Sequence, residues 1–178
     1  MKARVRCSPC AELGGGVTRE DVTVLGITKR GVRALVEAGD ETAILALFDE
    51  DPHRVQRFLK RLACAPDAAH HARTIECFRM LSRERSARMP EFFRETIRRS
   101  LWEMNEESGN VAWSAPEIVA AVVAGAPERY GRFASYLIMA ALGEPTFHPS
   151  LIAAADLLAS ANPALVEEFL PQLESLRR

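Results

Sequence analysis

The chain has 178 residues, of which 48% are hydrophobic and 26% are charged, and its formal net charge at pH 7 is −1. This length fits one domain with a substantial core, and the charge balance provides no basic field of the kind that favours nucleic acid. No apolar run is long enough to span a membrane, and the basic N-terminus lacks the apolar stretch of a signal peptide. We therefore expect a cytoplasmic protein that binds neither nucleic acid nor membrane.

The predicted elements are helices throughout, which makes the expected fold class all-α. Apolar residues recur with the period of an α-helix, and no stretch alternates apolar and polar residues for long. Residues 1–16 are expected to be a disordered tail, and residues 17–178 a single domain. Capping residues, glycines and prolines divide this domain into consecutive helix pairs, which are 19–26 and 28–38, 41–50 and 52–63, 67–84 and 90–108, 115–124 and 127–142, and 149–160 and 163–176.

A regularly spaced proline marks the start of the second helix in each of the last four pairs. These residues are Pro52, Pro90, Pro127 and Pro163, with spacings of 38, 37 and 36 residues. Proline is favoured in the first turn of a helix because its fixed φ suits the helix and its missing N–H is not needed there. A period in this range is typical of stacked helix pairs that cannot bury their apolar faces alone. The pattern predicts an α-solenoid of about four pairs behind an N-terminal helical cap.

Residues 43–62, AILALFDEDPHRVQRFLKRL, carry the sharpest form of the repeat. Asp49, Asp51 and Pro52 match a D-x-D-P turn, whereas Val55 and Arg57 come one and two positions later than in the full pattern D-x-D-P-x-V-R. The segment resembles a HEAT repeat, particularly the HEAT-like repeats named after the phycobilisome lyases. The later repeats keep the proline without the acidic pair. The resemblance implies stacked helix pairs and, as an alternative function, a lyase-like or cofactor-handling activity.

The turn LWEMNEESGNVAWSAP, residues 101–116, is the best candidate for a site. Acidic residues at the end of the predicted helix 90–108 face the negative end of its dipole, which is unfavourable. Either they are solvated or locally hydrogen-bonded, or they face a binding partner; a catalytic or metal-binding role is the third alternative. Ser114 and Glu117 match a capping box at the start of the next helix. The side chains expected to make specific contacts are Trp102, Glu103, Asn105, Glu106, Glu107 and Trp113.

In the binding interpretation each of these residue types has a physical role. The three glutamates contact a basic group, Asn105 forms hydrogen bonds, and the two tryptophans supply apolar contact area if they are not part of the core. The expected function is a non-catalytic scaffold that binds a protein or peptide along the surface of the stacked second helices, without a cofactor. Recognition of alkylated DNA, known for other HEAT-like folds, requires a basic channel that the overall charge does not favour.

Few residues carry a pattern that indicates chemistry. Cys7 and Cys10 form a CxxC without the strand–helix context of a redox site or a second ligand pair for zinc, so no metal is expected and these two are the weak candidates. Cys64 and Cys77 are interpreted as small buried hydrophobes. The histidines are expected to be surface or cap residues, and the arginines to form a solvated face mixed with acids; they are His53, His70, His71 and His148, and Arg83, Arg85, Arg88, Arg94, Arg98 and Arg99.

Overall fold

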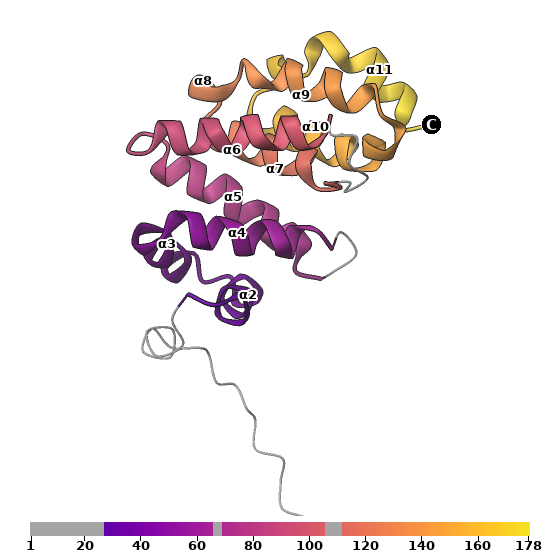
Figure 1. Ribbon diagram of the computed structural model, residues 1–178. Coiled ribbons are helices and arrows are strands. Elements are labelled where there is room, and N and C mark those ends of the chain that lie inside the picture. The colour runs from indigo at the N-terminus through magenta and orange to yellow at the C-terminus, as the bar shows by residue number, and fades with distance from the viewer. Residues whose placement is uncertain (1–26, 66–68, 106–111) are drawn as a thin grey trace, which may run out of the picture.

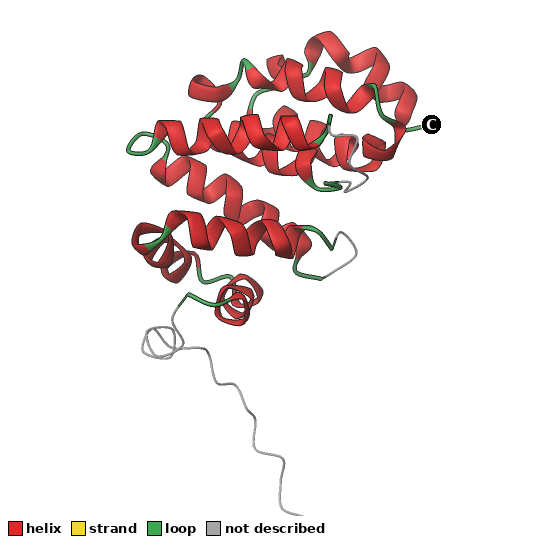
Figure 2. Cartoon of the chain, viewed as in Figure 1, coloured by secondary structure: helices red, strands yellow, loops and turns green. Residues whose placement is uncertain are grey.

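The computed structural model describes residues 27–65, 69–105 and 112–178. Every regular element within these ranges is helical, which confirms the all-α prediction (Figure 2). The α-helices are α2 (Lys29–Ala38), α3 (Glu41–Glu50), α4 (Pro52–Ala63), α5 (His71–Arg85), α6 (Pro90–Glu103), α7 (Ala115–Gly125), α8 (Pro127–Tyr130), α9 (Phe133–Leu142), α10 (His148–Ala161) and α11 (Leu170–Leu176). Short 3-10 helices are η1 (Pro145–Phe147), η2 (Pro163–Leu165) and η3 (Glu167–Phe169). The predicted tail 1–16 and helix 19–26 lie outside the described ranges.

Helix α7 is the centre of the core. Its sequence, APEIVAAVVAG, is apolar on nearly every side, and a helix of this kind must be covered all round. Helices α5, α6, α9 and α10 pack against it. Two of the helices that begin at the regularly spaced prolines, α4 and α6, run across one side of the molecule, with α9 beyond α6 (Figure 1). None of the helices in the described ranges combines the length and the apolar character needed to cross a membrane.

Three of the predicted helices end or break earlier than expected. Helix α6 ends at Glu103 instead of residue 108. The predicted helix 127–142 is interrupted between Tyr130 and Phe133, where the Tyr130 ring is fully buried and its hydroxyl donates to the Pro90 carbonyl. The predicted helix 163–176 consists of two 3-10 turns before α11, because Pro171 has no N–H for a continuous helix.

Asp49 and Asp51, the two acidic residues before Pro52, each form hydrogen bonds that stabilise the fold. Asp51 is the N-cap of α4, and its Oδ1 accepts a hydrogen bond from the backbone N–H of Arg54 at 2.9 Å. Asp49 accepts two hydrogen bonds from the Arg85 guanidinium, at 2.7 and 2.8 Å. The pair therefore starts one helix and fastens the end of α3 to the end of α5.

The Asp49–Arg85 pair makes a pH-dependent contribution to stability. The hydrogen bond from Arg85 lowers the pKa of Asp49 below its ordinary value of 3.8. A lowered folded-state pKa contributes stability that is present above the unfolded pKa and is lost as the pH falls through the folded pKa. We expect Asp49→Asn to lower the free energy of unfolding by less than about 1 kcal/mol at pH 7, since the pair is partly exposed to solvent.

Urea denaturation from pH 7 downwards measures this contribution. The difference between wild type and Asp49→Asn should shrink as the pH falls below 3.8. Glu50→Gln is the control, because Glu50 is exposed and has no cation within salt-bridge distance in the described ranges. Identical behaviour of the two variants at every pH would contradict a role for the Arg85 pair.

Candidate functional site

A groove of about 760 Å³ lies between α4 and α6. Its floor contains the Phe92 ring, against which the His53 imidazole packs with the ring centres 5.1 Å apart. The Gln56 amide donates a hydrogen bond across the floor to the Thr96 hydroxyl. Both walls are thus held in place by side chains that join α4 to α6.

The α4 wall is basic because of the periodicity of that helix. Its apolar residues, including Val55 and Leu59, are buried in the core. Arg54, Arg57 and Arg61, spaced three and four residues apart, therefore lie together on the opposite, exposed face. Their guanidinium groups form what we call the arginine strip, consisting of Arg54, Arg57 and Arg61.

Cations outnumber carboxylates along the groove. Its lining contains five basic side chains of Arg or Lys and three carboxylates. Two ion pairs remove part of this charge: Lys60 Nζ lies 2.9 Å from Glu103 Oε1, and Arg99 Nε lies 2.7 Å from Glu95 Oε1. Arg99 thereby lowers the pKa of Glu95. The arginine strip has no carboxylate within 4.0 Å among the described residues, so it is the part of the groove available to an anionic group.

An apolar hollow of about 660 Å³ lies on the other side of α6, against α9. Helix α9 buries Leu137 and Ile138 in the core, yet its outer face is also apolar. Tyr136 and Met139 are 61% and 58% exposed. The side chains that line the hollow are Leu101, Asn105, Arg132, Phe133, Tyr136, Met139 and Ala140. Contiguous exposed apolar surface of this kind marks interaction sites more often than isolated apolar residues do.

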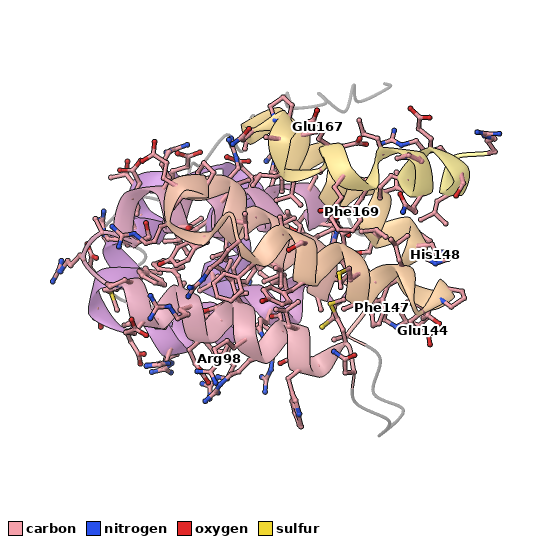
Figure 3. All side chains as sticks on the ribbon, turned by 90° about the horizontal axis from the view of Figure 1, so that it is seen from above. Arg98, Glu144, Phe147, His148, Glu167 and Phe169 are labelled. Atoms are coloured by element: carbon pink, nitrogen blue, oxygen red, sulfur yellow. The ribbon has the colours of Figure 1, made fainter. Side chains whose placement is uncertain are left out.

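Trp102 stands on the ridge of α6 between the two depressions. Its neighbours in the sequence line different depressions, Leu101 the apolar hollow and Glu103 the basic groove. Adjacent helical residues point about 100° apart, so the indole projects outward between them, and it is 63% exposed. Arg98, one helical turn earlier, likewise points away from the neighbouring helices (Figure 3).

The structure brings together three of the six residues that the sequence singled out. Trp102, Glu103 and Asn105 all lie at the C-terminal end of α6. Glu103 is paired with Lys60 of α4, and the Asn105 amide donates to the Leu101 carbonyl at 2.8 Å. Glu106 and Glu107 lie outside the described ranges.

The second tryptophan is also at the surface. Trp113 is 49% exposed immediately before α7, so the alternative that places either tryptophan in the core is wrong. The next residue, Ser114, does not cap α7; its hydroxyl donates instead to the Ala63 carbonyl at the end of α4. The predicted capping box is therefore incorrect, since a longer-range contact satisfies the serine.

Glu117, the other half of that predicted box, joins three helix starts. One carboxylate oxygen lies 3.0 Å from His71 Nε2 at the start of α5. The other accepts a hydrogen bond from the Ser150 hydroxyl in the first turn of α10 at 3.2 Å. The histidines were predicted to be surface or cap residues: His70 is at the N-cap position of α5, but it and His71 are buried, so neither is a surface histidine. The sequence contained no signal for this contact, because 46 residues separate His71 from Glu117.

This polar cluster does not have the geometry of a nucleophile and its base. The Glu117 carboxylate lies between the hydroxyl of Ser150 and the imidazole of His71, whereas activation of a hydroxyl requires the imidazole next to it. The described ranges contain no group of three or more His, Cys, Asp or Glu side chains arranged to hold a metal ion.

The two cysteines that were predicted to be small buried hydrophobes differ in their burial. Cys77 is buried as expected, and burial raises the pKa of its thiol to about 12, which keeps it protonated at neutral pH and makes it a poor nucleophile. Cys64 is exposed at the end of α4, contrary to the prediction. Cys7 and Cys10 lie outside the described ranges.

Sequence reasoning missed the arginine strip and the outer face of α9. The strip had a readable signal in the spacing of Arg54, Arg57 and Arg61 within a helix that contains no acid. The all-round apolar sequence of α9 predicts a fully buried helix, and only the arrangement of its neighbours leaves one face open. The site is thus a basic groove and an apolar hollow separated by an exposed tryptophan.

Comparisons with protein-family models, with curated proteins and with solved structures give no match to this chain.

Proposed function

We propose that this chain is a non-catalytic scaffold, an α-solenoid of about four HEAT-like helix pairs with an N-terminal helical cap, that binds a protein or peptide along its second helices. The observation that carries the proposal is the 63% exposed Trp102 between two depressions on one surface. Tryptophan is enriched among the residues that dominate binding energies, because it combines large contact area with few rotatable bonds. An indole in this position can contact a partner that occupies either depression.

The side chains around Trp102 support binding rather than chemistry. An ion pair in the groove holds Glu103 and Lys60 in defined positions before any partner arrives, and a hydrogen bond to the Leu101 carbonyl does the same for Asn105 at the edge of the hollow. Preorganisation of this kind lowers the entropic cost of association. The buried Cys77 thiol, protonated at neutral pH, does not serve the lyase-like alternative.

Affinity capture from the native extract tests this proposal. Wild type, Trp102→Ala and Leu170→Ala would be compared by quantitative mass spectrometry, after circular dichroism has shown that all three are folded. Leu170 is an exposed apolar residue on α11 that lines neither depression, which makes it a matched control. We expect a partner whose capture falls at least about tenfold with Trp102→Ala and stays unchanged with Leu170→Ala. Equal capture by all three proteins would refute the proposed site.

A further inference from the structure

The basic character of α4 indicates the charge of the partner. Between Pro52 and Ala63 this helix has three arginines and a lysine but no carboxylate, although the whole chain has a net charge of −1. Lys60 is neutralised by Glu103, whereas the arginine strip is not paired within the described residues. The planar guanidinium group binds carboxylates through two parallel hydrogen bonds. The groove is therefore suited to a segment that carries several carboxylates.

The apolar hollow indicates a second property of the partner. Leu101 and Met139 present aliphatic and thioether groups, and Tyr136 presents an aromatic ring. The Arg132 guanidinium lies 5.0 Å from the centre of the Phe133 ring, so the aromatic floor is held by a cation stacked on it. Such a surface accepts a large apolar side chain, with methionine adapting to its shape.

The distance between the two depressions sets the spacing of these features. They lie on opposite sides of a single helix, and neighbouring packed helices are about 8–10 Å apart. An extended peptide advances about 3.3 Å per residue. A strand crossing the ridge at Trp102 therefore places an apolar side chain roughly three residues from its carboxylates.

The surface fits a peptide better than a nucleic acid. Asp51, Glu95 and Glu103 line the basic groove and would repel a continuous phosphate backbone. The α6–α9 hollow is mostly apolar and offers one cation, Arg132, beyond the ridge. Discrete carboxylates can contact the arginine strip and avoid these acids, which evenly spaced phosphates cannot do.

We infer that the partner is an acidic peptide segment of another protein that crosses α6 at Trp102. Its carboxylates contact the arginine strip, and an apolar side chain about three residues away enters the α6–α9 hollow. This inference rests on the proposed scaffold function and adds to it the chemistry of the partner.

Fluorescence anisotropy with synthetic peptides tests the inference directly. The probes are fluorescein-labelled peptides with a triglutamate block and one phenylalanine, separated by roughly one to six positions. Matched peptides replace glutamate by lysine or phenylalanine by alanine. We expect the acidic peptides to bind at least about tenfold more tightly than the lysine peptides, with the strongest binding at a separation of about three, and to weaken as salt is added. Equal binding of acidic and basic peptides, or no binding of any acidic peptide, would overturn the inference.

Charge reversal separates recognition from folding. Arg54→Glu combined with Arg57→Glu should weaken binding of the acidic peptide at least about thirtyfold and strengthen binding of the lysine peptide, which an unfolded variant could not do. The control reverses Lys29 and Arg30, two exposed cations of α2 that line neither depression. Met139→Gln, which adds no charge, should weaken binding of the phenylalanine peptides and leave binding of the matched alanine peptides unchanged. If the Arg54→Glu, Arg57→Glu variant bound the acidic and lysine peptides as tightly as wild type does, the arginine strip would not be the binding site for the carboxylates.

Two further outcomes distinguish this inference from the scaffold proposal. A natural partner that is lost with Trp102→Ala but fully retained by the Arg54→Glu, Arg57→Glu variant would overturn the acidic segment and leave the scaffold standing. A single-stranded oligonucleotide that binds more tightly than the acidic peptides, and is lost on charge reversal, would instead identify a nucleic-acid surface.

Discussion

Gly125→Ala should destabilise the fold by about 3 kcal/mol, because the backbone of α5 lies too close to this glycine of α7 to admit a Cβ. A Cβ at residue 125 would lie 2.8 Å from the Ser82 Cβ and 3.0 Å from the Arg83 backbone nitrogen, and closer still to the Arg79 carbonyl oxygen. Two of these atoms belong to the backbone, which cannot rotate away. The helices would have to separate, and the hydrogen bond from the Ser82 hydroxyl to the Val122 carbonyl at 2.7 Å would lengthen with them.

Urea denaturation of Gly125→Ala beside Gly143→Ala measures this effect. At Gly143 the added Cβ would meet its nearest atoms at 3.6 and 3.8 Å, which is ordinary contact, and the backbone has a negative φ. The control should therefore retain the wild-type midpoint within the range of about 0.5 kcal/mol seen for neutral substitutions. Equal midpoints for the two variants would show that α5 and α7 are not in close contact at this position.

Tyr130→Ala should cost about 3–5 kcal/mol, the range for removing a fully buried aromatic side chain. The Tyr130 ring has no exposed surface, and its hydroxyl donates to the Pro90 carbonyl at 3.0 Å. Removing it would leave a cavity where α8 packs near the start of α6 and would also remove this hydrogen bond between the two helices. Tyr130→Phe keeps the ring and loses only the hydrogen bond, so about 1 kcal/mol is expected.

The only other tyrosine of the chain is the control for this series. Tyr136 is 61% exposed in the apolar hollow, so Tyr136→Ala should change the free energy of unfolding by no more than about 0.5 kcal/mol. The same variant should nevertheless weaken binding of the phenylalanine-containing peptides. A Tyr130→Ala protein as stable as Tyr136→Ala would contradict the burial of the first ring.

Local sequence signals were reliable where their energetics are local. Prolines at 52, 90 and 127 begin helices as predicted, and Gly39 ends α2 in the left-handed conformation that glycine adopts without strain. Asn162 accepts a hydrogen bond from the Ala164 N–H as the N-cap of its turn. Each of these features depends on backbone conformation within a few residues, and the amino-acid types alone favour it.

The local signals failed where a distant partner competed for the same group. Ser114 and Glu117 have the spacing of a capping box, yet Ser114 bonds to the Ala63 carbonyl and Glu117 to His71 and Ser150. Arg99 lies four residues before Glu103 on the same helix, yet Arg99 pairs with Glu95, and Glu103 pairs with Lys60 of α4. Side chains with several possible partners choose among them only when the helices are packed.

The sequence by itself determined that this protein is all-helical and that the prolines at 52, 90 and 127 begin helices. These properties follow from periodicity and capping, which depend on residues close together in the chain. Only the tertiary structure decided which helix faces remain uncovered, because exposure depends on how neighbouring helices are placed. The exposure of Trp102 on the ridge of α6 and of Tyr136 in the apolar hollow follows from that placement. For this reason the sequence pointed to the end of α6, whereas the two depressions beside it emerged only from the packing of α4, α6 and α9.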